Sequence, residues 1–217
     1  MSRNVRISIG LVAAVVATVA VAALLTRDDD DGATVAADAP QDRQELLVRA
    51  DSPRLTDGDQ AEFVEFLDFE CEACAALHPT IQELKTTYGD RVAFVVRYMP
   101  LHVSSMNAAL AAEAAGAQGN YVEMHDLLFE RQDEWGHQQT PERDLFFTYA
   151  ADLGLDMDQF EADFSSPETA ARIEQSEADG RALGVEGTPT MFMDGEQLRP
   201  ESIDDLVAAF DAAVNDR

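Results

Sequence analysis

Two cysteines, Cys71 and Cys74, are the residues of this chain whose type and spacing most clearly predict chemistry. They are its only cysteines, and Glu72 and Ala73 separate them. An apolar stretch precedes them and a segment with helical periodicity follows, so we expect Cys71 at a helix N-terminus. Unpaired backbone N–H groups and the helix dipole stabilise an anion there, which lowers the thiol pKa and makes Cys71 a nucleophile. Cys74 lies one turn later and can resolve a mixed disulfide.

Three other roles for this pair of cysteines are less consistent with the sequence. A structural disulfide between them would close too small a loop to stabilise the fold much. A metal site that added His78 would lack a fourth ligand, and covalent haem attachment needs a histidine where Ala75 stands. We therefore predict redox chemistry by the two thiols, with no metal and no other cofactor.

Composition excludes several other classes of function. The chain carries 15 Lys and Arg against 42 Asp and Glu, which gives a formal net charge of −27. That balance provides no basic surface for a phosphate backbone, so we exclude a nucleic-acid partner. With 46% hydrophobic and 26% charged residues, the chain is too apolar for wholesale disorder and too charged for a polytopic membrane protein.

An uncharged apolar segment near the N-terminus, residues 7–25, is long enough to cross a bilayer. Arg3 and Arg6 precede it, so the positive-inside rule places the N-terminus in the cytoplasm and the remaining chain outside. We predict a membrane anchor or signal sequence over residues 1–27. A retained single-pass span is favoured, and secretion after cleavage of a signal peptide is the alternative.

The folded domain is predicted to cover residues 45–217, after an acidic flexible linker over residues 28–44. Apolar patterns predict the following elements: strands over 46–48, 61–69 and 92–99, a helix over 72–88, turns over 51–59, a strand hairpin within 188–198 and a closing helix over 201–214. The segment at about 103–183 has almost no strand pattern and predicts helices. This order is typical of an α/β sheet with a helical insertion.

The stretch EFLDFECEACAALHP resembles the active-site segment of DsbA-like members of the thioredoxin superfamily. Glu65 lies six residues before Cys71, where these proteins carry a buried acid. Pro79 lies eight residues after Cys71, at the position of their helix-kinking proline. Thr188 and Pro189, within the sequence GTPT, resemble the cis-proline loop that faces the disulfide in this family.

The resemblance implies a thioredoxin fold, a central mixed sheet flanked by helices, with an inserted helical domain. It implies that buried Glu65 takes the proton of Cys74 during exchange, and that the Thr188 backbone beside a cis Pro189 pairs with an extended substrate. It also implies an extracytoplasmic oxidoreductase that acts on thiol-containing exported proteins. We expect an oxidase, which a quinone-coupled membrane partner re-oxidises.

Two alternatives for the function stay open at this point. One is a thiol reductase or isomerase fed by a membrane electron transporter, and the other is a non-catalytic, membrane-tethered binding module. Glu72 favours the reductive direction, because strongly oxidising relatives carry a histidine between the cysteines and a negative charge disfavours the Cys71 thiolate. The four histidines are expected to be satisfied core or surface side chains: His78, His102, His125 and His137.

Overall fold

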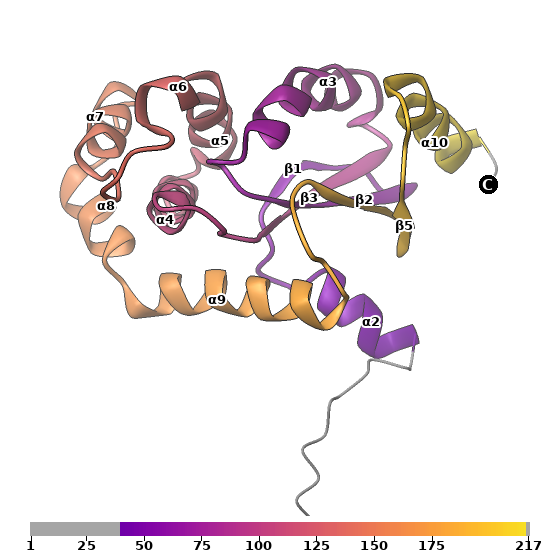
Figure 1. The fold of residues 1–217 in the computed structure, drawn as a ribbon, viewed down its shortest axis with the longest axis horizontal. Helices are drawn as coiled ribbons and strands as arrows, with labels where there is room; N and C mark the ends of the chain where they lie inside the picture. The colour runs from indigo at the N-terminus through magenta and orange to yellow at the C-terminus, as the bar shows by residue number, and fades with distance from the viewer. Residues whose placement is uncertain (1–39, 216–217) are drawn as a thin grey trace, which may run out of the picture. The chain divides into compact units, whose positions relative to one another are not determined.

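The sheet and helices of the computed structural model, which describes residues 40–215, place a five-stranded mixed sheet beside a block of helices (Figure 1). The strand order is β1-β3-β2-β4-β5. Central β2 (Ala61–Leu67) pairs parallel with β3 (Val92–Tyr98) and antiparallel with β4 (Thr190–Met193). The predicted thioredoxin-type sheet is therefore confirmed.

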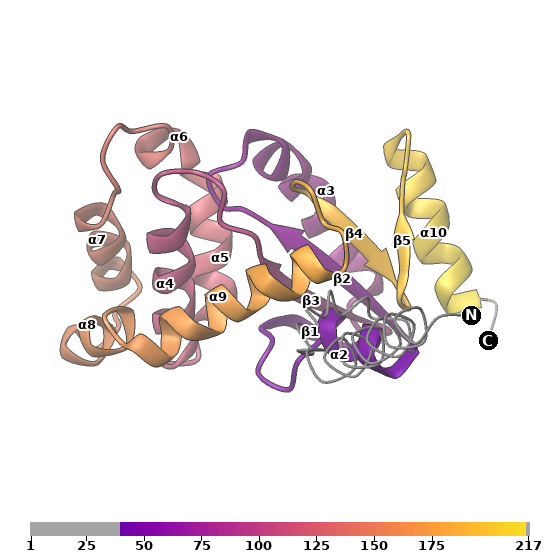
Figure 2. The ribbon, with the colours of Figure 1, turned by 60° about the horizontal axis from the view of Figure 1, so that its bottom comes forward.

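Helices cover both faces of this sheet. In Figure 1, α3 (Glu72–Tyr88) and α10 (Ile203–Asn215) lie above it, and α2 (Pro40–Leu47) and α9 (Pro167–Ala182) lie below. The insertion between β3 and β4 begins with five further helices: α4 (Ser105–Gly116), α5 (Tyr121–Glu130), α6 (Gln132–Trp135), α7 (Asp144–Asp152) and α8 (Met157–Phe164). Figure 2 shows α9 running back from this block along the sheet, which confirms the predicted helical insertion.

The apolar content of the central strands explains why they are buried on both sides. β2 and β3 are almost continuously apolar, as expected of neighbouring parallel strands covered by helices on both faces. On one face, the ring centroids of Phe63 and Phe94 each lie within 5.3 Å of the Phe210 ring of α10. On the other face, Gly180 lets α9 approach closely, because a Cβ there would lie 2.9 Å from Cε1 of Phe66.

The sequence prediction was wrong about the first strand. Leu46 and Leu47 lie in α2, and the first strand is β1 (Arg54–Asp57), inside the segment predicted as turns. Three consecutive apolar residues do not distinguish a strand from a buried helical turn, and buried Leu47 packs as part of the core. The Asp-Gly turn signal is real, but it follows the edge strand β1 and does not replace it.

The N-terminal part of the predicted domain plan, residues 1–44, overlaps the described residues only from Pro40 onward. α2 begins at Pro40, inside the predicted linker 28–44, while the rest of that linker lies outside the described residues. The predicted membrane span, residues 7–25, also lies outside them. Among the helices between residues 40 and 215, none combines the length and apolar character needed to cross a bilayer.

The hairpin predicted near the C-terminus is present. β4 pairs antiparallel with β5 (Glu196–Leu198) around Asp194 and Gly195, whose φ angles are 48° and 87°. Two successive residues with positive φ suit the tight turn that matches strand twist, which explains the Asp-Gly sequence.

A buried ion pair joins α9 to the centre of the sheet. Arg97 of β3 and Asp179 of α9 are 3% and 2% exposed, and Arg97 Nη2 donates to Asp179 Oδ2 at 2.6 Å. Arg97 Nη1 also donates to the carbonyl oxygens of Leu46 and Leu47 at the end of α2. Burial alone would raise the pKa of Asp179, but hydrogen bonds from Arg49 and Arg97 outweigh it and lower the pKa.

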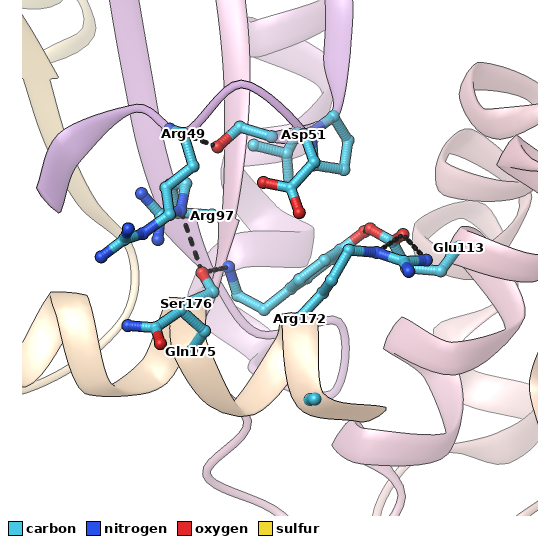
Figure 3. Close-up of a pocket in the computed structure, with 12 residues that line it drawn as sticks. Arg49, Asp51, Arg97, Glu113, Arg172, Gln175 and Ser176 are labelled. Carbon is cyan, nitrogen blue, oxygen red and sulfur yellow. Dashed lines mark hydrogen bonds and ion pairs between the residues drawn. The ribbon is translucent and has the colours of Figure 1, made fainter. Parts of the chain in front are cut away.

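A cavity of about 200 Å³ opens beside this ion pair, between the β1–β3 side of the sheet and α4 and α9 (Figure 3). Its cationic side chains are already paired: Arg49 and Arg97 with Asp179, and Arg172 with Glu113 at 2.9 Å. Neither cysteine is among its lining residues. The cavity is therefore separate from the predicted chemistry.

Removing the Asp179 carboxylate should destabilise the fold strongly, because it leaves the Arg97 guanidinium buried without its counter-charge. We expect Asp179→Ala to lower the free energy of unfolding by about 3–5 kcal/mol in urea denaturation. Glu177→Ala, on the same helix, is the control: it removes a solvent-accessible pair with Arg181 and should cost less than about 1 kcal/mol. Equal losses in the two variants would contradict this assignment.

Candidate active site

The Cys71 thiol lies at the junction of β2 and α3. Cys71 is the N-cap of α3, with extended backbone angles of φ −74° and ψ 121°. Its own amide N–H donates to the Asp68 carbonyl oxygen at 3.1 Å, and the Asp68 carboxylate accepts from the Glu70 amide at 2.9 Å. These bonds fix the short loop that aims the first cysteine at the start of the helix, as predicted.

The second part of the site is the loop that leads into β4, far from Cys71 in the sequence. Because β4 pairs antiparallel with β2, the loop before Thr190 reaches the start of α3. The Thr188–Pro189 peptide bond is cis, as the resemblance implied. Cys71 Sγ lies 3.4 Å from the Thr188 carbonyl oxygen, which places the predicted loop directly against the predicted nucleophile.

The pKa of Cys71 is lowered to about 5 by its surroundings. The largest cause is a hydrogen bond from the Cys74 thiol. Burial opposes it, and the Thr188 side chain and the backbone N–H groups of Cys74 and Ala73 add further stabilisation of the thiolate. Those N–H groups are the unpaired donors of the first turn of α3, so the helix N-terminus contributes as predicted.

Cys74 has the opposite character. Its side chain is 1% exposed, against a half-buried Cys71, and both cysteines are free thiols that approach to 3.8 Å. The hydrogen bond to Cys71, burial and the charge of Glu65 all raise the pKa of Cys74 far above its usual range. One sulfur therefore carries the negative charge of the reduced pair, and the other keeps its proton.

Glu65 lies on β2 with its side chain 6% exposed, so the predicted burial is confirmed. Burial first, and then the charge of Cys71, raise the pKa of Glu65 to about 7. A carboxyl group that titrates close to neutral pH is suited to accept and return a proton.

Glu72, whose charge the sequence analysis expected to disfavour the Cys71 thiolate, is largely exposed to solvent. Its carboxylate is 79% exposed and lies 3.3 Å from His137 Nε2, a contact with the helical insertion. The largest contributions to the pKa of Cys71 come from Cys74, burial and Thr188. Solvent screens the charge of an exposed carboxylate, so we expect Glu72 to affect the Cys71 pKa less than these contacts do.

Sequence reasoning missed two buried carboxylates, Asp68 and Glu70, that hold the site together. Asp68 accepts from the Leu101 amide at 2.8 Å and from His102 Nδ1 at 2.6 Å. Burial alone would lower the pKa of His102, but the hydrogen bond and charge of Asp68, with the charges of Cys71 and Glu70, outweigh it and raise the pKa. The signal available in the sequence was an acidic residue on each side of Phe69, in a stretch that is otherwise apolar.

The helical insertion supports the active-site loop through four further hydrogen bonds. Glu70 is 1% exposed and accepts from the backbone amides of Ser104 at 2.6 Å and His137 at 2.7 Å. Gln132 Nε2 of α6 donates to the carbonyl oxygens of Phe69 at 2.6 Å and Cys71 at 3.1 Å. The insertion therefore orders the residues on which the thiol chemistry depends.

One group of described side chains has the composition of a metal site. One ligand atom each from His78, His125 and Asp126 lie within 4.8 Å of one another, at the contact of α3 and α5. Burial lowers the pKa of His78 to about 4 and also lowers that of His125. His125 Nε2 is buried without a hydrogen-bond partner, so the expectation of four satisfied histidines is wrong for this residue.

Comparison with known proteins agrees with this geometry. A family profile described as Thioredoxin matches residues 59–212. A thioredoxin-like oxidoreductase from Silicibacter pomeroyi is 30% identical and superposes with a TM-score of 0.66, over 79% of this chain and 96% of that protein. At lower identity, which shows the fold alone, alpha-DsbA1 from Wolbachia pipientis is 19% identical with a TM-score of 0.68, over 80% of this chain and 96% of that one.

Longer proteins also contain a segment similar to this chain. One is named as a Na(+)/H(+) antiporter NhaA from Herminiimonas arsenicoxydans, 39% identical over 140 residues. Another is NhaA 3 from Salinispora tropica, 40% identical over 150 residues. The match covers 64% and 67% of this chain but only 22% of each antiporter. The chain therefore spans about a fifth of these relatives.

The raised pKa of Glu65 predicts a pH dependence of stability. Below pH 4.5, the pKa of an unperturbed glutamate, the carboxyl is protonated in the folded and the unfolded states. Its ionisation then does not change the free energy of unfolding. As pH rises toward 7, the unfolded chain ionises while the folded protein resists, so stability is lost through this window. In reduced protein, wild type should lose about 3 kcal/mol more than Glu65→Gln between acidic and mildly alkaline pH. Urea denaturation across this range measures it, and parallel curves would show that Glu65 titrates normally.

Proposed function

Since the chain belongs to the thioredoxin family, we propose that it is a DsbA-like thiol–disulfide oxidoreductase that oxidises pairs of thiols in exported proteins through Cys71 and Cys74. The observation that carries this proposal is the contrast between the two sulfurs. The pKa of Cys71 is lowered to about 5, while that of Cys74 is raised. A stabilised thiolate stabilises the reduced protein, which makes its disulfide a stronger oxidant.

The first step is attack by a substrate thiolate on Cys71 Sγ of the Cys71–Cys74 disulfide. Cys71 is the sulfur within reach, because its side chain is half-buried while that of Cys74 is 1% exposed. A bond forms between the substrate sulfur and Cys71, and the bond to Cys74 breaks. The electron pair leaves on Cys74, and Glu65 is the group whose raised pKa suits it to deliver the proton.

The second step releases the oxidised substrate. A second substrate thiolate attacks the substrate sulfur of the mixed disulfide, and Cys71 leaves with the electron pair. Its low pKa makes it a good leaving group, so the same feature favours completion of the reaction. The substrate has lost two electrons as its disulfide forms, and the protein retains them as a thiolate and a thiol.

The loop at Thr188 and Pro189 is the proposed binding surface for the substrate backbone. The Thr188 carbonyl oxygen lies 3.4 Å from Cys71 Sγ, so an extended chain that pairs with this segment brings its cysteine to the disulfide. Leu101 and Val103, which are 43% and 49% exposed, flank His102 and offer apolar contacts nearby. No nucleic-acid or cofactor site enters this proposal.

We place the catalytic domain outside the cytoplasm, held by a single-pass anchor within residues 1–27 and a linker that ends before α2 at Pro40. The support is the apolar segment at residues 7–25 with arginines before it. The expected partner is a membrane protein that re-oxidises the dithiol and passes the electrons to a quinone. A membrane electron donor would replace it if the chain were a reductase or isomerase.

A redox titration against glutathione separates the oxidase from its alternatives. We expect the Cys71–Cys74 couple to lie above about −180 mV, toward the strongly oxidising members of the superfamily. A value near about −270 mV would indicate a reductase, and a couple that glutathione does not reduce would indicate a structural disulfide. Glu72→Gln should leave the potential almost unchanged, because the Glu72 carboxylate is exposed.

Activity of cysteine variants tests the assignment of roles. Wild-type protein in its oxidised form should oxidise a reduced peptide that contains two cysteines, and Cys71→Ser should abolish this activity. With a peptide that already contains a disulfide, reduced Cys74→Ser should accumulate a mixed disulfide: the Cys71 thiolate attacks one peptide sulfur, the other leaves as a thiolate, and the resolving thiol is missing. Mass spectrometry identifies the cross-linked cysteine. Trapping through Cys74 in a Cys71→Ser variant at the same rate would contradict the assignment.

A further inference from the structure

The contact between α3 and α5 contains a cluster of potential ligands that the disulfide chemistry does not use. His78 projects from α3 with 7% exposure, and His125, 1% exposed, projects from α5 beside Asp126. His125 Nδ1 lies 2.9 Å and His78 Nε2 lies 3.9 Å from the same oxygen, Asp126 Oδ1. These distances bracket the separation of about 3.3 Å expected between ligand atoms around a tetrahedral zinc ion.

In the metal-free protein, the two ring nitrogens of His125 cannot both have a suitable hydrogen-bond partner. Nδ1 faces the Asp126 carboxylate and needs a proton to bind it, since a bare lone pair would repel the oxygen. Nε2 then holds a buried lone pair with no donor. The His125 ring is in edge-to-face contact with Phe69 and Phe129, at centroid distances of 5.5 and 5.2 Å, and aromatic rings accept N–H groups but donate none.

A cation between Nδ1 and Asp126 removes this conflict. Nδ1 would donate its lone pair to the cation, and the proton would belong to Nε2, among the aromatic rings. Two imidazoles and one carboxylate are borderline donors of the kind that bind zinc, with water in the fourth position. We propose that His78, His125 and Asp126 form a zinc-type divalent metal site that links the active-site helix to the helical insertion.

Lys85 and Gln82 show how the site is held without metal. Lys85 Nζ lies 3.3 Å from Asp126 Oδ2, and Gln82 Nε2 donates to Asp126 Oδ1 at 2.6 Å. The ammonium group therefore supplies positive charge at Oδ2. An incoming cation must also displace the Gln82 amide, whose Nε2 lies 3.4 Å from His78 Nε2 as well as beside Asp126 Oδ1. Asp126 is 26% exposed, which provides a path of entry from solvent.

Because its ligands come from α3 and α5, a metal ion at this site would stabilise the contact between the two helices. His78 lies four residues after Cys74 on α3, and His125 and Asp126 belong to α5, so one ion would cross-link both elements. A ligand that binds only the folded state stabilises it, and the melting temperature should rise with zinc concentration. This inference concerns metal binding alone and holds whichever direction the thiol chemistry takes.

Calorimetric titration of the full oxidised chain with zinc tests the proposal. The Cys71–Cys74 disulfide must be formed, so that thiolates do not bind the metal. We expect one zinc ion per chain, with affinity lowered at least about tenfold in both Asp126→Asn and His78→Gln. His137→Gln is the matched control, because His137 is exposed and lies outside the cluster, and its affinity should equal that of wild type.

Lys85→Gln should change the zinc affinity in the opposite direction. Removing the competing ammonium should raise zinc affinity, whereas a purely structural network would gain nothing. Cobalt provides a second readout: wild type should show the visible absorption of tetrahedral Co(II), without a thiolate charge-transfer band, and Asp126→Asn should not. Circular dichroism checks folding, and partly exposed Asp126→Asn decides the question if His78→Gln is unfolded. Absence of zinc binding by wild type, or equal affinity in Asp126→Asn and wild type, would overturn the proposal.

Discussion

The negative charge on the Cys71 sulfur is the interaction on which the proposed chemistry depends. Cys71 stands at the first turn of α3, where backbone N–H groups have no helical partner. The Cys74 thiol and the Thr188 side chain complete its surroundings, and together they lower its pKa to about 5. The sheet matters to this charge because β2 leads into the helix and β4 leads out of the Thr188 loop, on neighbouring strands.

Three buried carboxylates support the Cys71 thiolate in two different ways. Asp68 and Glu70 accept hydrogen bonds from the backbone of the active-site loop and of the insertion, and so fix the helix start. Glu65 lies deeper, where burial raises its pKa to about 7. A carboxyl at that depth would repel the thiolate if ionised, so its protonated form allows it to lie near the pair without destabilising the Cys71 charge.

The sequence predicted the parts of the site that follow from local pattern. The apolar runs of β2 and β3, the helical spacing of α3 and the Asp-Gly hairpin appear where expected, because each is decided by neighbours in the chain. The edge strand β1 and the contacts of Glu72 could not be predicted in this way. β1 is defined by pairing with β3, and Glu72 by an insertion residue, His137, that is distant in sequence.

Direct titration of Cys71 tests the central claim. Ultraviolet absorbance of the thiolate should follow a midpoint near pH 5 in the reduced wild-type protein. The midpoint should rise in Cys74→Ala, because that variant loses the hydrogen bond that contributes most. It should hardly move in Glu72→Gln, whose carboxylate is exposed. A wild-type midpoint near the ordinary thiol value of about 8.5 would contradict the account.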